Sequence, residues 1–245
     1  MSQNSKPNNA FILAAGKGTR LRPHTNDKPK PMVEVHGQPI ITHIIDKLSA
    51  EKVSNITVNT SYLGKVLEDY LTHHQTPSLY FSHENELLDT GGGVKNALHT
   101  MKNQPFYLIN GDAYWVDDSK ENSALSQLYN VWDDSQMDIL LLLQPQEIMT
   151  LTKGVGDYDM DGNGALTRTK DLSGEYMFTG IRIVHPRIFE QTPDAAFSFL
   201  ECMDKAQENG RLHGVHYQEG IWHHISTPDD LNAVNNDENQ KQKVA

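Results

Sequence analysis

The most constraining feature of the sequence is an apolar run that breaks into a glycine-rich, basic loop. The run ends at Leu13 and Ala14, residues 15–20 read AGKGTR, and a rigid Pro-Lys-Pro segment follows at residues 29–31. A strand that stops at a glycine-rich turn exposes several backbone N–H groups in one concavity, which suits an anion such as a phosphate. Arg20 and Lys30 add positive charge to that concavity. The segment therefore predicts a nucleotide triphosphate site at the end of a strand.

Two common glycine motifs do not describe this loop. The dinucleotide fingerprint needs a third glycine, which residues 16–21 lack, and the P-loop spacing before Gly-Lys-Ser/Thr occurs nowhere in the sequence. The remaining alternative is an ordinary surface turn rich in Gly, Lys and Pro. The joint occurrence of the apolar run, two glycines, Arg20 and Pro-Lys-Pro disfavours that alternative.

Composition limits the class of protein. The chain has 245 residues, a net charge of −11 and one cysteine, Cys202. The length suits a single α/β domain spanning residues 1–245, and the acidic balance argues against nucleic acid or an anionic membrane as a partner. One cysteine excludes an internal disulfide framework and fits a reducing compartment, so we expect a cytoplasmic protein. Residues 1–8 and 236–245 are polar and are expected to be flexible.

Apolar runs alternate with helical periodicities along the chain. This alternation predicts an α/β fold, a Rossmann-like wound mixed sheet with helices on both faces. We expect buried strands at residues 10–14, 55–59, 106–109, 138–143 and 178–184. Helices are expected over residues 40–48, 63–71, 90–101, 125–132 and 196–209, with a closing helix from Pro228 capped by Thr227. Candidate ligand residues follow several of these strands, where open α/β sheets bind ligands.

Residues 13–31 resemble the signature of the sugar-1-phosphate nucleotidyltransferases, and the resemblance runs from about Asn9 to Leu231. It implies the nucleotide-diphospho-sugar transferase fold, with a nucleotide half to about Leu143 and a small sugar-binding lobe after it. In such enzymes a sugar-1-phosphate oxygen attacks the α-phosphorus of an NTP and expels pyrophosphate. The residues that the resemblance assigns to the nucleotide are Leu13, Ala14, Ala15, Gly16, Gly18, Thr19, Asp89, Gly91 and Gly92.

The resemblance also assigns catalytic roles to two positively charged residues. Lys30 matches the lysine that contacts the α-phosphate and the incoming phosphoryl group, and its flanking prolines restrict the backbone. Arg20 matches the arginine that grips the departing pyrophosphate, a task that suits a bidentate guanidinium. Each could instead be a solvated surface base, which the surrounding motif disfavours.

A Mg²⁺ site is the cofactor implied. Asp112 matches the aspartate that follows the central strand in the family and ligates Mg²⁺, although a single Asp after a strand is often a turn residue. The second metal aspartate is expected where this chain has His224, and imidazole is a poorer ligand for Mg²⁺ than a carboxylate. His224 stays a candidate metal ligand, with a phosphate contact or packing beside Trp222 as the alternatives.

The resemblance assigns separate residues to the base and to the sugar. Residues 88–93 resemble the base-recognition loop, in the form found in N-acetylmuramate α-1-phosphate uridylyltransferases, and glycines there let the backbone approach a base edge. The sugar side is then assigned to Asn59, Asp157, Thr179 and Gly180. Each of these residues could also be a cap or a turn residue. The Glu-Lys-Pro motif that holds the sugar phosphate in many relatives is absent, and Lys153 or Lys170 could substitute.

Three functions remain open on the sequence. The leading hypothesis is a Mg²⁺-dependent enzyme that makes UDP-N-acetylmuramate from UTP and the sugar 1-phosphate in cell-wall sugar recycling. The alternative within the class is a mannose-1-phosphate guanylyltransferase, and the alternative outside it is a non-catalytic sensor of nucleotide or sugar phosphate. An NTP and a sugar 1-phosphate are the expected partners, and a monomer or weak homodimer is the expected state.

Overall fold

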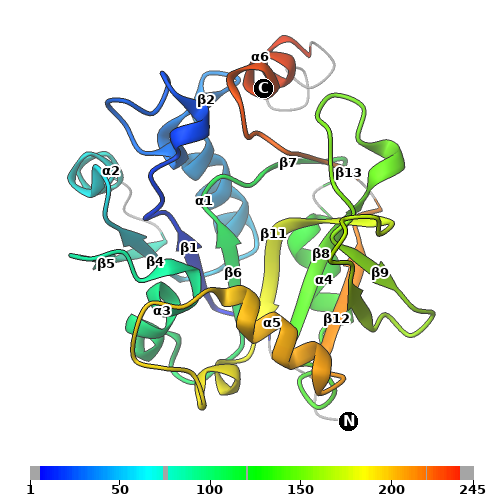
Figure 1. The fold of residues 1–245 in the computed structure, drawn as a ribbon. Helices are drawn as coiled ribbons and strands as arrows, with labels where there is room; N and C mark the ends of the chain where they lie inside the picture. Colours follow the sequence, from blue (N-terminus) through cyan, green and yellow to red (C-terminus); the bar gives the residue numbers. More distant parts are fainter. Residues whose placement is uncertain (1–5, 74–76, 120, 219, 238–245) are drawn as a thin grey trace.

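The computed structural model describes residues 6–73, 77–119, 121–218 and 220–237. A large mixed sheet runs through the molecule (Figure 1). Its strands are β1 (Asn9–Leu13), β4 (Asn55–Thr60), β5 (Ser78–His83), β6 (Phe106–Asn110), β8 (Ile139–Pro145), β9 (Tyr158–Met160), β10 (Leu166–Arg168), β11 (Tyr176–Val184) and β12 (Leu212–His216).

The order of the strands brings one end of the parallel core together. Strands β5, β4, β1 and β6 lie side by side and run parallel. Strand β11 is antiparallel to β6 and to β8, and β12 is parallel to β8. The β9–β10 hairpin joins the edge of β11 through Tyr176 and Tyr158. The carboxyl ends of β1, β4 and β6 therefore open onto the same edge of the sheet.

Helices cover both faces of the sheet, as predicted. Along β1, Ile12 belongs to one hydrophobic cluster and Phe11 to the other, because successive side chains of a strand point to opposite faces. The first cluster takes its helical residues from α1 (Ile40–Ala50), α2 (Gly64–Leu71), α4 (Ala124–Val131) and α6 (Pro228–Asn236). The second takes them from α3 (Asp89–Asn96) and α5 (Phe199–Glu208). The apolar run in β8 likewise alternates between the two clusters, which explains why it contains so few polar residues.

Two small two-stranded sheets were not predicted from the sequence. Strands β2 (Glu34–Val35) and β3 (Gln38–Pro39) form a short hairpin before α1. Strand β7 (Tyr114–Asp117) pairs with β13 (Gly220–His223), which ties the C-terminal segment to the residues that follow β6. Five short 3-10 helices complete the described elements: η1 (Thr19–Leu21), η2 (Lys30–Met32), η3 (Leu98–Met101), η4 (Gln146–Ile148) and η5 (Pro186–Phe189).

Local side-chain bonds set the helix ends. Thr227 caps α6 as predicted, since its hydroxyl accepts from the backbone N–H of Asp230 and the Asp230 carboxylate accepts from the N–H of Thr227. The helix expected from residue 196 begins instead at Phe199, because Ser198 and Glu201 form a capping box there. The helix expected over residues 90–101 ends at residue 96 and continues as η3.

The predicted flexible ends are only partly described. Residues 1–5 and 238–245 lie outside the described residues. Residues 6–8 are held in place: Lys6 pairs with Glu51, and the Asn8 carbonyl accepts from the backbone N–H groups of Ser54 and Asn55. In the described part of the chain, no helix combines the length and the apolar character needed to cross a bilayer.

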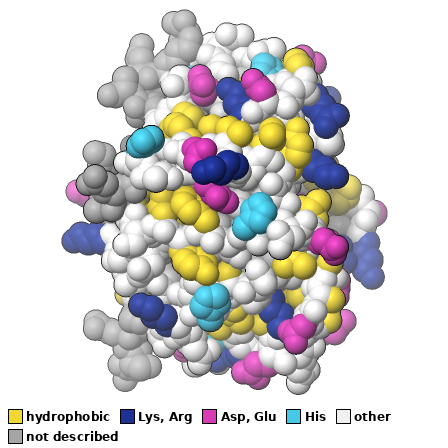
Figure 2. Space-filling view, turned by 90° about the vertical axis from the view of Figure 1, so that its left-hand side faces the viewer, with side chains coloured by type: hydrophobic (Ala, Val, Ile, Leu, Met, Phe, Trp, Pro, Cys, Tyr) yellow, Lys and Arg dark blue, Asp and Glu magenta, His cyan; other side chains and the backbone are white. Residues whose placement is uncertain are grey.

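The face over α2 and β5 has mixed charges. Figure 2 shows acidic and basic side chains spread over it, with hydrophobic side chains between them. One of the ion pairs in α2 joins Lys65 to Asp69 one helical turn later. Such mixing is typical of a solvated protein surface.

Candidate active site

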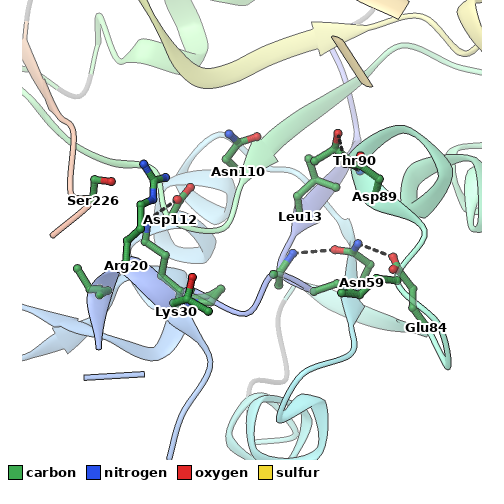
Figure 3. A pocket seen from close by; sticks show the side chains of 18 residues that line it. Leu13, Arg20, Lys30, Asn59, Glu84, Asp89, Thr90, Asn110, Asp112 and Ser226 are labelled. Atoms are coloured by element: carbon green, nitrogen blue, oxygen red, sulfur yellow. Dashed lines mark hydrogen bonds and ion pairs between the residues drawn. The ribbon is translucent and has the colours of Figure 1, made fainter. Parts of the chain in front are cut away.

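A cavity of about 610 Å³ opens at the carboxyl ends of β1, β4 and β6 (Figure 3). The cavity is therefore at the edge of the sheet where α/β proteins bind ligands. Eleven predicted site residues line it: Leu13, Ala14, Ala15, Gly16, Gly18, Thr19, Arg20, Lys30, Asn59, Asp89 and Asp112. Glu84, Asn110 and Ser226 also line it, and they were not predicted as site residues.

The glycine loop is shaped by its contact with the Pro-Lys-Pro segment. Gly18 has φ 59°, and a Cβ there would lie 2.9 Å from the Cβ of Lys30. Both the positive φ and the close approach require glycine at this position. The Gly18 carbonyl accepts from the Thr25 hydroxyl at 2.8 Å, which fixes the turn. The loop consequently lies directly beside Lys30.

Lys30 and Asp112 form an ion pair inside the cavity. The Lys30 Nζ lies 2.6 Å from the Asp112 Oδ2. The loop that carries Asp112 is held by Gly111, whose N–H donates to the Leu13 carbonyl at 2.8 Å and whose missing side chain avoids that oxygen and Pro31. Figure 3 shows Arg20 on the same side of the cavity as this pair. Two positively charged side chains and one carboxylate thus face the same cavity, an arrangement that suits phosphate groups and a cation.

The opposite side of the cavity is built on a buried amide and a buried carboxylate. Asn59 is 2% exposed and Glu84 is 3% exposed. The Asn59 Oδ1 accepts from the backbone N–H of Ala14 at 2.7 Å, and its Nδ2 donates to Glu84 Oε1 at 2.7 Å. Glu84 Oε2 in turn accepts from the N–H of Leu88 at 3.0 Å. The network joins the glycine loop to residues 84–88. Glu84 follows the strand β5, and only its position after a strand end could have indicated it.

The triple glycine does not form an open loop. Gly91 and Gly92 lie in α3, and the backbone N–H groups of both donate to the Phe197 carbonyl. A Cβ on Gly91 would lie 2.3 Å from the Phe197 ring. Among the described residues, the cavity is lined in this region by Leu87, Asp89 and Thr90. Gly91 and Gly92 are not among the residues that line this cavity, and they allow α3 to pack closely against the segment before α5; their approach to a base stays a prediction.

The residues expected on the sugar side lie at different depths. The Thr179 hydroxyl is buried and donates to the Leu142 carbonyl at 2.8 Å, so it links β11 to β8. Gly180 has φ +79°, and a Cβ there would lie 2.9 Å from the Asn110 side chain. Asp157 lines a second cavity, which shares Asn110 with the first. Its carboxylate accepts from the N–H of Phe178 at 2.9 Å, and burial raises the pKa of Asp157 above its usual value.

His224 lies in an aromatic and backbone environment. Its ring stacks on Trp222 with centroids 5.8 Å apart, and its Nδ1 lies 3.2 Å from the Lys153 carbonyl. Across the described ranges, no cluster of three or more His, Cys, Asp or Glu side chains could hold a metal ion. Asp112 lines the cavity and His224 is not among its lining residues, and the metal role of each stays a prediction.

A family model described as "Nucleotidyl transferase" matches residues 9–149 of the chain. The chain belongs to this nucleotidyl transferase family. Its relatives include the N-acetylmuramate alpha-1-phosphate uridylyltransferase of Caulobacter vibrioides, which is 35% identical over 91% of this chain and 93% of that protein. The mannose-1-phosphate guanyltransferase of Neurospora crassa is 27% identical over 91% of this chain and 62% of that protein.

A similar solved structure supports the same assignment. The structure of HddC from Yersinia pseudotuberculosis complexed with GMP-PN has a TM-score of 0.74 and 25% identity, and the match covers 93% of this chain and 97% of that one. The predicted fold class is thus confirmed as the mixed α/β fold of the nucleotide-diphospho-sugar transferases. The chain is an enzyme of the sugar-1-phosphate nucleotidyltransferase type.

Proposed function

We propose that this nucleotidyl transferase makes UDP-N-acetylmuramate from UTP and N-acetylmuramate α-1-phosphate, as part of cell-wall sugar recycling. The observation that carries the proposal is the Lys30–Asp112 pair beside the glycine loop, in the cavity at the ends of the parallel strands. The similarity to the Caulobacter enzyme over most of both chains supports the choice of sugar and base.

The proposed reaction needs alignment and charge neutralisation more than acid–base groups. An oxygen of the sugar phosphate attacks the α-phosphorus of UTP, and the bond from that phosphorus to the β-phosphate oxygen breaks to release pyrophosphate. Lys30 contacts the α-phosphate and the incoming phosphate, because its Nζ already faces the cavity. Arg20, which is exposed at the cavity wall, binds the departing pyrophosphate.

The residues present fit a Mg²⁺ ion. Mg²⁺ sites in nucleotide enzymes commonly use one or two carboxylates, waters and substrate phosphates, and Asp112 supplies one carboxylate in the cavity. When bound, the ion would neutralise charge on the triphosphate. Asp112 would hold the ion, and Lys30, whose Nζ now pairs with that carboxylate, would face the phosphates.

The base is placed on the side of Asn59 and Glu84. Both side chains are already hydrogen-bonded within the protein, so we assign them to positioning the glycine loop and residues 84–88. Leu87, Asp89 and Thr90 are the wall residues left to contact the base. GTP and mannose 1-phosphate form the second candidate pair of substrates, which the similarity to the Neurospora enzyme supports.

The setting of the reaction also remains a proposal. A single buried cysteine and a net charge of −11 fit an enzyme of the cytoplasm, acting as a monomer or weak homodimer on soluble substrates. A sensor that had lost its chemistry would bind nucleotide without releasing pyrophosphate. The presence of Arg20, Lys30 and Asp112 in one cavity favours the enzyme.

The test is pyrophosphate release with Mg²⁺ over a grid of four NTPs and four sugar 1-phosphates. The sugars are N-acetylmuramate, N-acetylglucosamine, mannose and glucose α-1-phosphates. Turnover that is greatest with UTP and the muramate sugar is the expected result. Preference for GTP with mannose 1-phosphate would replace the proposal by the guanylyltransferase, and nucleotide binding without pyrophosphate from any pair would favour the sensor.

A further inference from the structure

A second cavity adjoins the nucleotide cavity. It has a volume of about 380 Å³, and Thr90 and Asn110 line both cavities. Its walls come from the β9–β10 region, β11 and the start of α5. The charged residues that line it are Asp157, Arg168, Lys170 and Arg182. Arg168 is neutralised by Asp204 at 2.8 Å, and the remaining lining still carries a net positive charge in a chain whose own net charge is −11.

Arg182 is the unusual member of this set. Only 2% of it is exposed, and its guanidinium lies between the rings of Phe178 and Phe199, at 5.1 and 4.5 Å from their centroids. Its Nη1 donates to the Asn110 Oδ1 at 3.3 Å, whereas its Nε is buried with no hydrogen-bond partner. Among the described residues, none of the ion pairs includes Arg182. Burial lowers the pKa of Arg182, which reflects the cost of burying this charge without a carboxylate.

Arg182 occupies an apolar position of the sheet. In register, Arg182 faces Leu108 of β6 and Leu141 of β8, and both leucines belong to the hydrophobic cluster beneath α3 and α5. A methionine would fill such a position without desolvating a cation. A guanidinium held against two rings is planar and can make in-plane hydrogen bonds. The arrangement therefore holds a cation whose Nε has no acceptor among the described residues.

We propose that the second cavity binds the sugar of the acceptor and that Arg182 pairs with a carboxylate carried by that sugar. The inference rests on the proposed function and deepens it, since it names the residue that selects an acidic sugar 1-phosphate over a neutral one. Asn110 joins the two cavities, because it holds Arg182 and stands two residues before Asp112. In N-acetylmuramate 1-phosphate the carboxylate is on the lactyl ether, whereas N-acetylglucosamine 1-phosphate lacks that group and is otherwise the same sugar.

The experiment compares these two sugars on the wild type and on Arg182→Met. The ratio of their kcat/KM values, with the NTP that the grid selects, measures the preference for the carboxylate. We expect the wild type to prefer the acidic sugar and Arg182→Met to lower that ratio by about 100-fold, with turnover of the neutral sugar retained. Lys65→Met, which removes the same charge from the exposed face of α2, is the matched control and keeps the ratio of the wild type.

Three results would overturn the inference. The first is an equal loss for both sugars in Arg182→Met, which is the signature of a merely structural role. The second is a wild type that prefers the neutral sugar. The third is a preference for the acidic sugar that Lys170→Met abolishes and Arg182→Met does not.

A substrate-side change covers the case in which Arg182→Met does not fold. The lactyl amide of N-acetylmuramate α-1-phosphate, tested on the wild type, should lose the same preference, and an amide as good as the acid would contradict the inference. If no NTP supports pyrophosphate release, the proposed function fails. Calorimetric binding of the acidic and neutral sugars to the wild type and Arg182→Met then still decides whether Arg182 binds the carboxylate.

Discussion

The hydrogen bond between Asn59 and Glu84 should be among the most costly polar contacts to remove. Both side chains are almost fully buried, and Asn59 also accepts from the backbone N–H of Ala14. Asn59→Ala removes a bond to a charged partner, worth about 1.5–3 kcal/mol, and a neutral one worth about 0.5–1.5 kcal/mol. The expected loss in free energy of unfolding is therefore about 3 kcal/mol, because Glu84 keeps its bond from the Leu88 N–H.

A double-mutant cycle isolates the pairwise part of this loss. Urea unfolding at pH 7 would be measured for the wild type, Asn59→Ala, Glu84→Ala and the double variant. The expected coupling energy is about 1.5–3 kcal/mol. Asn55→Ala is the matched control on the same strand, since Asn55 donates to the neutral side chain of Asn9 at 3.2 Å. A coupling below about 0.5 kcal/mol, or an equal cost for Asn55→Ala and Asn59→Ala, would refute the reasoning.

Three further changes test single features of the site. Gly91→Ala should lower the free energy of unfolding, measured in urea, by about 1–3 kcal/mol, because its Cβ would overlap the Phe197 ring. Gly16→Ala is the control with a smaller expected loss, since a Cβ at residue 16 would meet no neighbouring atom. A stabilised Gly91→Ala would contradict the packing role. Burial raises the pKa of Asp157, so the folded state binds the carboxyl proton more tightly than the unfolded state does. The stability therefore falls as the pH rises past about 4, the pKa of an Asp in the unfolded chain. Asp157→Asn should therefore gain stability over the wild type near pH 7, and unfolding curves at pH 4 and 7 that show the opposite trend would count against this. His224→Ala should leave the Mg²⁺ concentration for half-maximal turnover unchanged, and an increase of about tenfold would return His224 to the metal site.

The local parts of the fold were predictable because they depend on nearby residues. The run from Ile139 to Leu143 alternates between two hydrophobic clusters, so its burial on both faces follows from its composition alone. The cap of α6 follows equally from Thr227 and Pro228. The glycine loop and the Pro-Lys-Pro segment line one cavity, and both were recognisable because each is a short motif that is continuous in the sequence.

The missed parts depend on contacts between distant residues. Trp115 of β7 and Trp222 of β13 are paired across more than a hundred residues, and neither short strand has a strong pattern of its own. The packing of the triple glycine could not be predicted because its partner, Phe197, is equally distant. Arg182 looked like one polar residue in a strand, and only the folded structure shows that two rings enclose it.

The central claim is that Lys30 acts at the phosphates in the cavity, and one comparison tests it most directly. Lys30→Met and Lys28→Met each remove one charge from the same loop, but Lys28 lies only near Glu34, at 3.7 Å. Pyrophosphate release with UTP, N-acetylmuramate α-1-phosphate and Mg²⁺ should fall about 100-fold or more in Lys30→Met, since it loses a preorganised charge. Lys28→Met should stay within about threefold of the wild type, because exposed ion pairs contribute little. Equal rates for the two variants would contradict the account.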